Sequence, residues 1–324
     1  MSKLCVAVIG ATGLVGQTFL KVLAEKNEDF ELKLFASEKS QGKRIRYKNR
    51  YYIVNSLNEN SFNDVDYACF FSTSQVSKQY IPIALKNNVK VIDNSSFFRM
   101  NPNVKLVAYG VNEHIINKED VLIANPNCCT IQSVLALNHL RKYNIKKIIY
   151  NTYQSVSGSG KKGIDDLLRC RQGKQPLFYE DDISFTCIPK IGEILDSAFS
   201  DEEEKMINET KKIFDDHNIN ILATCVRVPI MFSHGVSINV ELENKIDIKQ
   251  FEEEVNKQSQ LVYCYDLIPT SSLSCKNDNV YLGRVRIIDN NVLLYCVADN
   301  VRVGAATNAY LILKHMIKIG EENG

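Results

Sequence analysis

Residues 1–127 alternate short apolar runs with segments of helical periodicity. The runs at residues 4–9, 32–35, 65–71 and 89–92 have the length of strands, and the first of them is apolar throughout, as in a strand that is covered on both faces. Between them, residues 15–23 and 76–85 carry apolar side chains at helical spacing. Strands that alternate with helices are typical of a parallel sheet, so this pattern predicts a Rossmann-like, doubly wound α/β domain.

After Cys128 the pattern changes. It predicts strands at residues 147–154, 224–229, 235–242, 285–288 and 292–297, followed by a helix at 305–319. Within 235–242 apolar and polar side chains alternate, which indicates a strand with one buried face. We therefore expect a second, α+β domain on an antiparallel or mixed sheet. Since no repeat or low-complexity linker is visible, we place the boundary at the change in pattern, between domains 1–127 and 128–304.

A glycine-rich turn joins the first predicted strand to the first predicted helix. Residues 10–16 read Gly-Ala-Thr-Gly-Leu-Val-Gly, a G-x-x-G-x-x-G spacing rather than the commoner G-x-G-x-x-G. A turn of this kind lets backbone N–H groups approach a pyrophosphate at the helix N-terminus. Its position between a strand and a helix favours nucleotide binding. The alternative is a plain tight turn that allows close helix packing.

The residues after the second strand bear on the choice of nucleotide. Ser37, Glu38, Lys39 and Ser40 stand where the adenosine ribose of a dinucleotide is read. Hydroxyls and a cation favour a 2′-phosphate, whereas an acidic residue favours a free 2′-hydroxyl. The three residues Ser37, Lys39 and Ser40 therefore favour NADP over NAD, and Glu38 is the one that points to NAD. A solvated polar loop is the alternative interpretation.

Composition and charge narrow the class of protein. The 324 residues suffice for two domains, and 39 basic against 38 acidic residues give a formal charge of +1. A balance of this kind argues against a nucleic-acid binder or a polybasic membrane binder. No apolar run is long enough to span a membrane, and ten cysteines without a secretion signal predict free thiols in a reducing compartment, the cytoplasm. No C-x-x-C or H-x-x-x-H pattern occurs, so we expect no metal site.

One cysteine has the setting of a nucleophile. Residues 121–124 predict a short buried strand, Pro126 ends it, and Asn127 is a good N-cap for the helix that follows. Cys128 would then lie in the first helical turn, where unpaired N–H groups and the positive end of the helix stabilise a thiolate. The alternative is a small core residue, as most free cysteines are.

Two other polar segments keep alternative interpretations. Arg99 follows two aromatic residues, so it could stack or cap a helix, or bind a phosphate bidentately. Residues 155–163 are rich in Ser, Gly and Lys but lack the G-x-x-x-x-G-K-[ST] spacing, which argues against an ATP site. A flexible loop or a close backbone approach to substrate fits this segment better.

Taken together, five motifs resemble the aspartate-β-semialdehyde dehydrogenase family, in the family's order and over nearly the whole chain. They are the glycine turn 10–16, Asn-Pro-Asn-Cys at 125–128, Ser-Val-Ser-Gly at 155–158, Cys-Val-Arg-Val-Pro at 225–229 with His234, and Asp299-Asn300 with the 304–308 segment. The resemblance is closest to the Gram-positive-like bacterial branch. It implies an NADP-binding domain 1–127 that a C-terminal helix, 305–324, completes, and a catalytic and dimerisation domain in a homodimer or homotetramer.

The resemblance also implies roles for individual residues. It assigns Cys128 as the nucleophile, His234 as the general acid/base, and Gln154 as the group beside the thiol that orients substrate. The residues implied in substrate binding are Arg99 and Lys205 for phosphate with Asn127 nearby, Arg227 for the α-carboxylate, and Glu202 for the amino group. Those implied in cofactor binding are Gly10, Thr12, Gly13, Leu14, Val15, Gly16, Ser37, Lys39, Ser40, Ser157, Gly158 and Asn308.

Four features depart from the family's pattern. Cys129 stands where Ser or Thr is usual, and so places a second thiol beside the nucleophile. Val303 replaces a frequent Lys, and the region between Arg171 and Phe185 is shorter than in many relatives. Lys39 also replaces a frequent Arg in the loop that holds the 2′-phosphate. These departures bear on the size of the dimer contact and on the NADP contact more than on the chemistry.

The expected reaction is the NADPH-dependent conversion of β-aspartyl phosphate to aspartate β-semialdehyde through a Cys thioester, in lysine, threonine and methionine biosynthesis. A related acyl reductase, acting on malonyl-CoA or N-acetylglutamyl phosphate, is the first alternative. The N-acetylglutamyl-phosphate enzymes usually have Gly where Asn127 stands, and neither alternative substrate offers the free amino group that Glu202 would bind. A non-catalytic NADP-binding sensor is the second alternative, and it predicts an unreactive Cys128.

Overall fold

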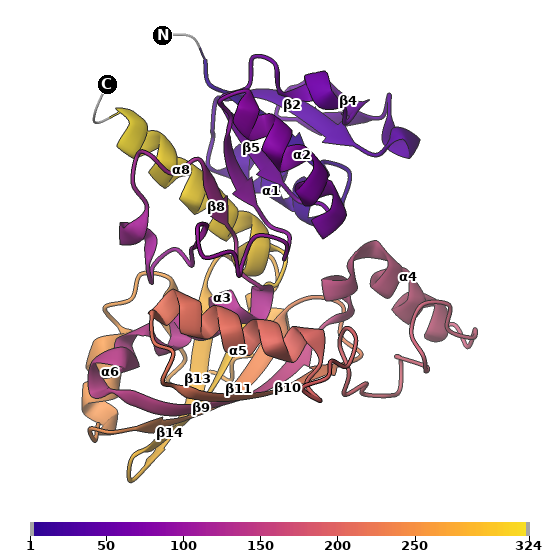
Figure 1. The fold of residues 1–324 in the computed structure, drawn as a ribbon. Coiled ribbons are helices and arrows are strands. Elements are labelled where there is room, and N and C mark those ends of the chain that lie inside the picture. Colours follow the sequence, from indigo (N-terminus) through magenta and orange to yellow (C-terminus); the bar gives the residue numbers. More distant parts are fainter. Residues whose placement is uncertain (1–2, 322–324) are drawn as a thin grey trace. The chain divides into compact units, whose positions relative to one another are not determined.

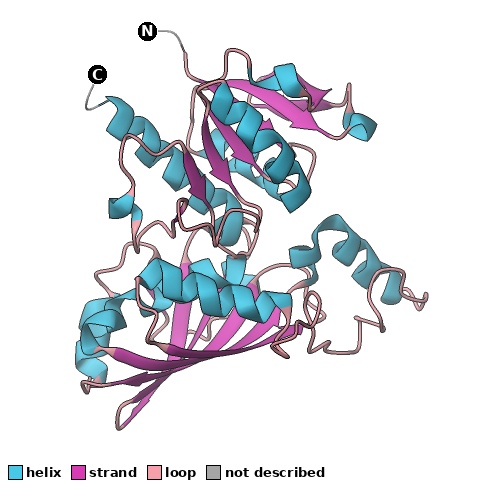
Figure 2. Ribbon diagram, in the orientation of Figure 1, coloured by secondary structure: helices cyan, strands magenta, loops and turns pink. Residues whose placement is uncertain are grey.

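The computed structural model describes residues 3–321, which form two compact units (Figure 1). The first unit consists of two segments of the chain, one that ends at Pro126 and one that begins at Ala305. The second comprises Asn127–Gly304. The last three residues of the expected C-terminal segment, 322–324, lie outside the described part of the chain. The mixture of two sheets and flanking helices confirms the expected α/β class with an added α+β unit (Figure 2).

The first unit is built on an eight-stranded sheet in the order β3-β4-β2-β1-β5-β6-β8-β7. Its strands are β1 (Cys5–Ile9), β2 (Glu31–Ala36), β3 (Arg44–Tyr47), β4 (Arg50–Ser56), β5 (Tyr67–Phe70), β6 (Lys90–Asp93), β7 (Lys105–Leu106) and β8 (Leu122–Ala124). Every pair in this sheet is parallel except β3 with β4. Helices α1 (Leu14–Glu25) and α8 (Asn308–Glu321) share one apolar core with the sheet, and α2 (Ser74–Lys86) packs in a second core.

The hairpin of β3 and β4 is absent from the sequence-based prediction. Its strands carry mostly polar or aromatic residues, and several are exposed, including Tyr51 and Ile53. Such a strand pair buries too little apolar surface to leave an apolar run in the sequence. The turn between the strands uses Lys48 at a φ of 50°. The hairpin follows the short 3₁₀ turn Glu38–Ser40, so it extends the sheet next to the expected ribose site.

The second unit is built on a six-stranded mixed sheet in the order β10-β9-β11-β14-β13-β12. Its strands are β9 (Ile145–Gln154), β10 (Asn220–Arg227), β11 (His234–Leu242), β12 (Leu261–Tyr263), β13 (Val280–Ile288) and β14 (Asn291–Ala298). The helices are α3 (Cys128–Leu137), α4 (Gly160–Cys170), α5 (Asp201–Phe214), α6 (Ile248–Val255) and α7 (Ser271–Ser274). Helices α3 and α5 cover one face of the sheet, and Figure 2 shows no helix of this unit on the opposite face.

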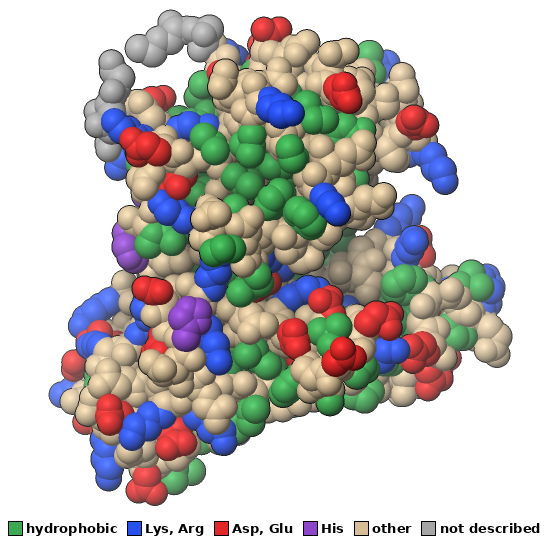
Figure 3. Space-filling model, in the orientation of Figure 1, with side chains coloured by type: hydrophobic (Ala, Val, Ile, Leu, Met, Phe, Trp, Pro, Cys, Tyr) green, Lys and Arg blue, Asp and Glu red, His purple; other side chains and the backbone are tan. Residues whose placement is uncertain are grey.

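Two local expectations need correction. Residues 155–163 are not an open loop, because Val156–Ser159 form a 3₁₀ turn and α4 starts at Gly160, whose φ is 70°. The C-terminal helix does not begin regularly at Ala305; a π-helical turn, Arg302–Thr307, precedes α8. Between residues 3 and 321 no helix combines the length and apolar character needed to cross a membrane. On the face shown in Figure 3, acidic and basic side chains are interspersed.

Candidate active site

The N-terminus of α3 is built as the sequence predicts. Asn127 has an extended backbone, and its Oδ1 accepts hydrogen bonds from the N–H groups of Cys129 (2.9 Å) and Thr130 (3.3 Å), which confirms it as the N-cap. The N–H of Asn127 in turn donates to the buried carboxylate of Glu209 at 2.6 Å. Cys128 is therefore the first residue of a helix whose N-cap, Asn127, is held by hydrogen bonds of both its side chain and its backbone N–H. Cys128 itself is half-buried.

The register of the second sheet places three of the expected site residues in one row. Gln154, at the end of β9, pairs with Arg227 of β10 on one side and with His234 of β11 on the other. All three side chains are buried. Helix α3 packs on β11, β13 and β14 of this sheet, and Gln132 of that helix donates a hydrogen bond to the carbonyl oxygen of His234 at 3.0 Å. Three strands that are distant in sequence thus contribute the side chains that line the sheet below Cys128.

Two sulfur atoms and an imidazole meet at this point. The Sγ atoms of Cys128 and Cys129 and one ring nitrogen of His234 all lie within 4.8 Å of one another. Hydrogen bonding with the Cys129 thiol, followed by the nearby His234, lowers the pKa of Cys128 well below its usual value, although burial opposes the shift. Burial holds the pKa of Cys129 well above its usual value. The two shifts run in opposite directions, so Cys128 is the thiol of the pair that ionises more readily.

The amide of Gln154 contacts the second thiol rather than the expected nucleophile. Its Nε2 donates to Cys129 Sγ at 2.7 Å and to Glu202 Oε1 at 3.0 Å. The same Glu202 oxygen accepts from Asn127 Nδ2 at 2.8 Å. The Cys129 N–H donates in turn to Asn127 Oδ1, so Asn127, Glu202, Gln154 and Cys129 form a closed ring of hydrogen bonds at the start of α3. Cys129 is a site residue whose contact with Gln154 the sequence did not predict.

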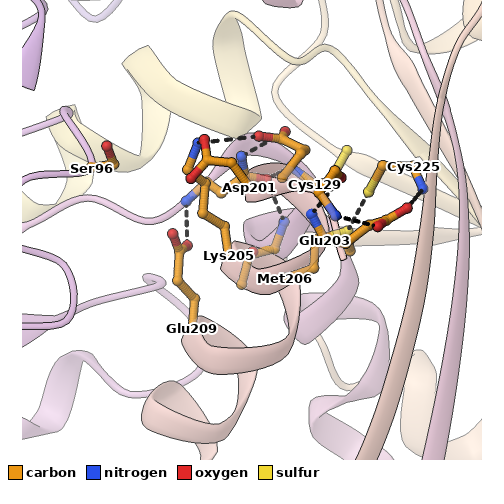
Figure 4. Close-up of polar contacts among 12 residues, drawn as sticks. Ser96, Cys129, Asp201, Glu203, Lys205, Met206, Glu209 and Cys225 are labelled. Carbon is orange, nitrogen blue, oxygen red and sulfur yellow. Dashed lines mark hydrogen bonds and ion pairs between the residues drawn. The ribbon is translucent and has the colours of Figure 1, made fainter. Parts of the chain in front are cut away.

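Helix α5 brings charged groups to the same region (Figure 4). Ser200 and Glu203 form a capping box at its start, and Glu203 also accepts from the N–H of Cys225 at 2.9 Å. Lys205 forms an ion pair with Asp201 and lies 3.6 Å from Glu202. Burial alone would raise the pKa of Glu202, but Lys205 and the hydrogen bonds from Asn127 and Gln154 outweigh it and lower that pKa. Glu202 is therefore an anion in a largely buried position.

Arg227 and His234 flank Gly158. The Arg227 guanidinium donates to the carbonyl oxygen of Ser155 at 2.6 Å. A Cβ on Gly158 would lie 2.7 Å from Arg227 Nη1 and 3.2 Å from His234 Nε2, so only glycine fits here without displacing either group. Ser157, the residue before it, is buried and donates to Asn300 Oδ1 at 3.0 Å. Residues 157 and 158 thus belong to the second unit, together with the sulfur cluster.

By distance alone, the two cysteines and His234 could hold a soft metal ion. The hydrogen bonding of the imidazole opposes this. Nδ1 accepts a hydrogen bond from the N–H of Ser155 at 3.0 Å, so in the neutral ring the proton resides on Nε2. Neither nitrogen then offers a free lone pair to a metal. The arrangement suits a thiolate nucleophile better than a metal centre.

The expected nucleotide-binding residues lie in the first unit. Gly10 has a φ of 83°, and its N–H and that of Ala11 both donate to the carbonyl oxygen of Phe35. A Cβ on Gly16 would lie 2.3 Å from the carbonyl oxygen of Gly10, so the helix approaches the turn more closely than any side chain allows. Helix α1 starts after Gly13 without a side-chain cap, which leaves its first N–H groups available to an anion.

The glycine turn contacts the expected ribose loop. Thr12 Oγ1 donates to Ser40 Oγ at 3.4 Å, and Lys43 Nζ donates to the same oxygen at 3.3 Å. Ser37 and Lys39 are exposed on the intervening 3₁₀ turn. Lys43 is a cation that the sequence reasoning missed. Lys43 directly precedes the unpredicted hairpin, and this position places its ammonium group beside the Ser40 hydroxyl.

Two other expected residues also belong to the first unit. Arg99 is buried, and its guanidinium donates to the carbonyl oxygen of Asn94 at 2.8 Å. Asn308 is buried as well: its amide donates to Val107 O at 2.9 Å and to Asn125 Oδ1 at 2.6 Å, and its oxygen accepts from the N–H of Tyr109 at 2.8 Å. The Asn308 amide thus has hydrogen-bond partners on both its nitrogen and its oxygen within the first unit. A direct contact with a nicotinamide would have to replace or share one of them.

Comparison with known proteins agrees with this division. Residues 5–119 match the family model described as semialdehyde dehydrogenase, NAD binding domain, and residues 137–303 match semialdehyde dehydrogenase, dimerisation domain. The aspartate-semialdehyde dehydrogenase of Aquifex aeolicus is 41% identical over 335 residues, covering 97% of this chain and 98% of the relative. The crystal structure of aspartate semialdehyde dehydrogenase II from Vibrio cholerae superposes with a TM-score of 0.93 at 37% identity, covering 98% of this chain and 99% of that one.

A nucleotide-binding unit, a dimerisation unit and a half-buried cysteine whose pKa is lowered define an oxidoreductase with a nicotinamide cofactor, a small-molecule substrate and an oligomeric assembly. Within this class, the chain belongs to the aspartate-semialdehyde dehydrogenase family. The expected resemblance is thereby confirmed.

Proposed function

We propose that this enzyme converts β-aspartyl phosphate to aspartate β-semialdehyde with NADPH, and runs the reverse reaction, through a thioester on Cys128. This places it in the biosynthesis of lysine, threonine and methionine. The observation that carries the proposal is the Cys128 sulfur at the start of α3, within 4.8 Å of a ring nitrogen of His234, in surroundings that lower the pKa of this thiol. A related solved structure, aspartate semialdehyde dehydrogenase II of Vibrio cholerae, is described as a complex with ASA.

The chemistry requires a group that both attacks and leaves. A thiolate does both, since it adds to the acyl carbon, displaces phosphate to give a thioester, and departs at the end as thiolate. A bound nicotinamide, held by the glycine turn and the loop at Ser40, supplies the hydride. The helix start at Asn127 keeps the Cys128 sulfur ionised, and His234 is its partner for hydrogen bonding to the reacting oxygen.

The charged groups around the thiolate match the charges of the substrate. Arg227 offers a guanidinium for the α-carboxylate, and ionised Glu202 offers an acceptor for the ammonium group. Lys205 and Arg99 would bind phosphate. The alternative substrates, malonyl-CoA and N-acetylglutamyl phosphate, have no free amino group that could bind the Glu202 carboxylate, so this residue favours the aspartyl substrate.

A substrate comparison tests the proposal. The enzyme is assayed for NADPH formation with aspartate semialdehyde, NADP and phosphate, and then with the semialdehyde corresponding to each alternative. We expect phosphate-dependent turnover with aspartate semialdehyde at a kcat/KM at least about 100-fold above that with the others, because they lack the ammonium group that the Glu202 carboxylate would bind. Equal or better turnover of another substrate, or no turnover at all, would contradict the proposal.

We also propose that NADP is preferred to NAD and that Lys43 contributes to this preference. Lys43 and Ser40 lie together beside Thr12 of the glycine turn. Lys43→Ala should raise the KM for NADPH roughly 10-fold and change the KM for NADH little, since a charged contact to phosphate contributes about 1.5–3 kcal/mol at most. Lys48→Ala, which removes a cation from the hairpin turn, is the matched control. An equal effect on both cofactors would remove Lys43 from this role.

The enzyme is further proposed to act as a homodimer or homotetramer in the cytoplasm. All ten cysteines are free thiols, as expected for a reducing compartment. Within the second unit, Tyr153 of β9 and Leu222 of β10 remain exposed on the sheet face that carries no helix. An exposed face of this kind is suited to a second copy of the chain. Light scattering on the purified enzyme distinguishes two copies from four.

A further inference from the structure

A buried carboxylate on α5 lies outside the expected set of site residues. Glu209 is 1% exposed, and its Oε2 accepts a hydrogen bond from the backbone N–H of Asn127 at 2.6 Å. Glu209 follows Glu202 by about two helical turns, so the two carboxylates lie on the same face of α5. Figure 4 shows Glu209 on this helix, in the same group of polar contacts as Lys205 and Asp201.

The two carboxylates hold one residue, Asn127. Glu202 Oε1 accepts from the side-chain amide of Asn127 at 2.8 Å, whereas Glu209 accepts from its backbone N–H. The other polar atom of the Asn127 side chain, Oδ1, accepts from the N–H groups of Cys129 and Thr130 and so caps α3. One face of α5 therefore fixes both the backbone and the side chain of the residue that precedes Cys128.

The backbone N–H of Asn127 needs an acceptor from outside its own helix. It is one of the first four N–H groups of α3, which no carbonyl group of that helix can satisfy. Asn127 is buried, and an unsatisfied N–H in such a position is costly. Without Glu209 the peptide would turn toward another acceptor, and Oδ1 would move away from the N–H groups that it caps.

We infer that Glu209 is a positioning residue for the nucleophile, because its bond to the Asn127 N–H keeps the N-cap of α3 in place beside Cys128. This inference rests on the proposed function, in which Cys128 is the residue that becomes acylated. Glu209 acts through Asn127, so it is assigned no contact with the substrate. Its contribution is the position of an acceptor oxygen and not its negative charge.

The position of the first turn of α3 matters for the reactivity of Cys128. The positive end of a helix stabilises a thiolate only close to the first turn. Cys128 also lies in close contact with the backbone at Gly304, where an added Cβ would lie 2.6 Å from the Cβ of Cys128. The site therefore has little spare room, and a shift of the helix start changes both the position of the sulfur and its pKa.

Charge and position predict opposite effects of Glu209 on Cys128. An anion near a thiol raises the pKa of that thiol, so removing a negative charge by itself lowers the pKa of Cys128 or leaves it unchanged. Displacing the first helical turn raises that pKa. Two conservative substitutions separate these effects. Glu209→Gln keeps the length and an acceptor oxygen without the charge, and Glu209→Asp keeps the charge on a side chain that is one methylene shorter.

The test is the rate at which iodoacetamide alkylates Cys128 in the intact enzyme as a function of pH, followed by peptide mass spectrometry. In Glu209→Asp we expect the midpoint of this profile to rise by about one pH unit, because the shorter side chain cannot reach the Asn127 N–H. In Glu209→Gln we expect the midpoint to stay within about 0.3 pH units. An unchanged profile in Glu209→Asp, or an equally large rise in Glu209→Gln, would overturn the inference.

A control variant removes a comparable set of bonds elsewhere in the second unit. Asp166 of α4 is buried and accepts hydrogen bonds from the consecutive backbone N–H groups of residues 177–179, away from α3. Asp166→Ala should lower the Tm by several degrees and leave the alkylation midpoint of Cys128 unchanged. The same rise in Asp166→Ala as in Glu209→Asp would show that general loosening of the unit moves the midpoint, which contradicts a specific role for Glu209.

The unchanged enzyme distinguishes a failure of this inference from a failure of the proposed function. If its Cys128 titrates as an ordinary thiol, with a midpoint at about pH 8.5, the proposed function itself fails. If the midpoint is well below that value and Glu209→Asp does not raise it, only the role of Glu209 fails. As a second readout, we expect kcat to fall about 10-fold in Glu209→Asp, with the Kd for NADPH within about twofold.

Discussion

Cys128→Ser lowers kcat by about 10⁴-fold or more and leaves the Kd for NADPH within about twofold. A serine hydroxyl at the start of α3 is not ionised at neutral pH, so the position keeps its shape and loses its nucleophile. The expected nucleotide-binding residues around Gly10 and Ser40 belong to the other compact unit, which the substitution does not touch. Turnover is measured with aspartate semialdehyde, NADP and phosphate, and NADPH binding by fluorescence titration.

Two other cysteines provide controls for this prediction. Cys187 is exposed and lies outside the sulfur cluster, so Cys187→Ser should change kcat less than twofold. Cys129→Ser keeps a small side chain that can accept the hydrogen bond from Gln154, and it should retain much more activity than Cys128→Ser. A loss of NADPH affinity in Cys128→Ser parallel to the loss of turnover would contradict the separation of the two sites.

Arg227→Lys should raise the KM for aspartate semialdehyde by about 100-fold with a much smaller change in kcat. The guanidinium uses one Nη1 bond to hold the Ser155 carbonyl, and its planar fork has further donors for a carboxylate. A lysine ammonium keeps the charge but cannot make both contacts at once. Because the carboxylate is bound equally in the ground and transition states, the loss appears in KM.

The matched control is Arg171→Lys. Arg171 also donates to a backbone carbonyl, that of Pro229 at 3.0 Å, but it is exposed and lies outside the site. Its replacement should leave both kinetic constants within about twofold. An unchanged KM in Arg227→Lys would take Arg227 out of carboxylate binding. A fall in kcat alone would indicate that its bond to Ser155 is what matters.

Local signals in the sequence predicted local structure well. Asn127 caps α3, and residues 235–242 form a strand that alternates between a buried and a more open face. In each case the information lies within four or so neighbouring residues. The Rossmann-like fold followed from the alternation of apolar runs and helical stripes, for the same reason.

The arrangement of the site depended on contacts that are distant in sequence. The pairing of Gln154 with both Arg227 and His234 is a matter of strand register, which no spacing within one strand reveals. The contact of Gln154 with Cys129, rather than with Cys128, depends on the rotation of α3 above that sheet. Lys43 is different, because it lies only three residues from Ser40; it was missed because the polar segment around it leaves no apolar pattern.

The most direct test asks whether the Cys128 sulfur becomes acylated. The enzyme is mixed with aspartate semialdehyde and NADP in the absence of phosphate, and the chain is digested and analysed by mass spectrometry. We predict up to one aspartyl group per chain, located on Cys128, formed together with an equal amount of NADPH and released when phosphate is added. An aspartyl group on another residue, or NADPH formation with no acylated cysteine, would contradict the thioester mechanism.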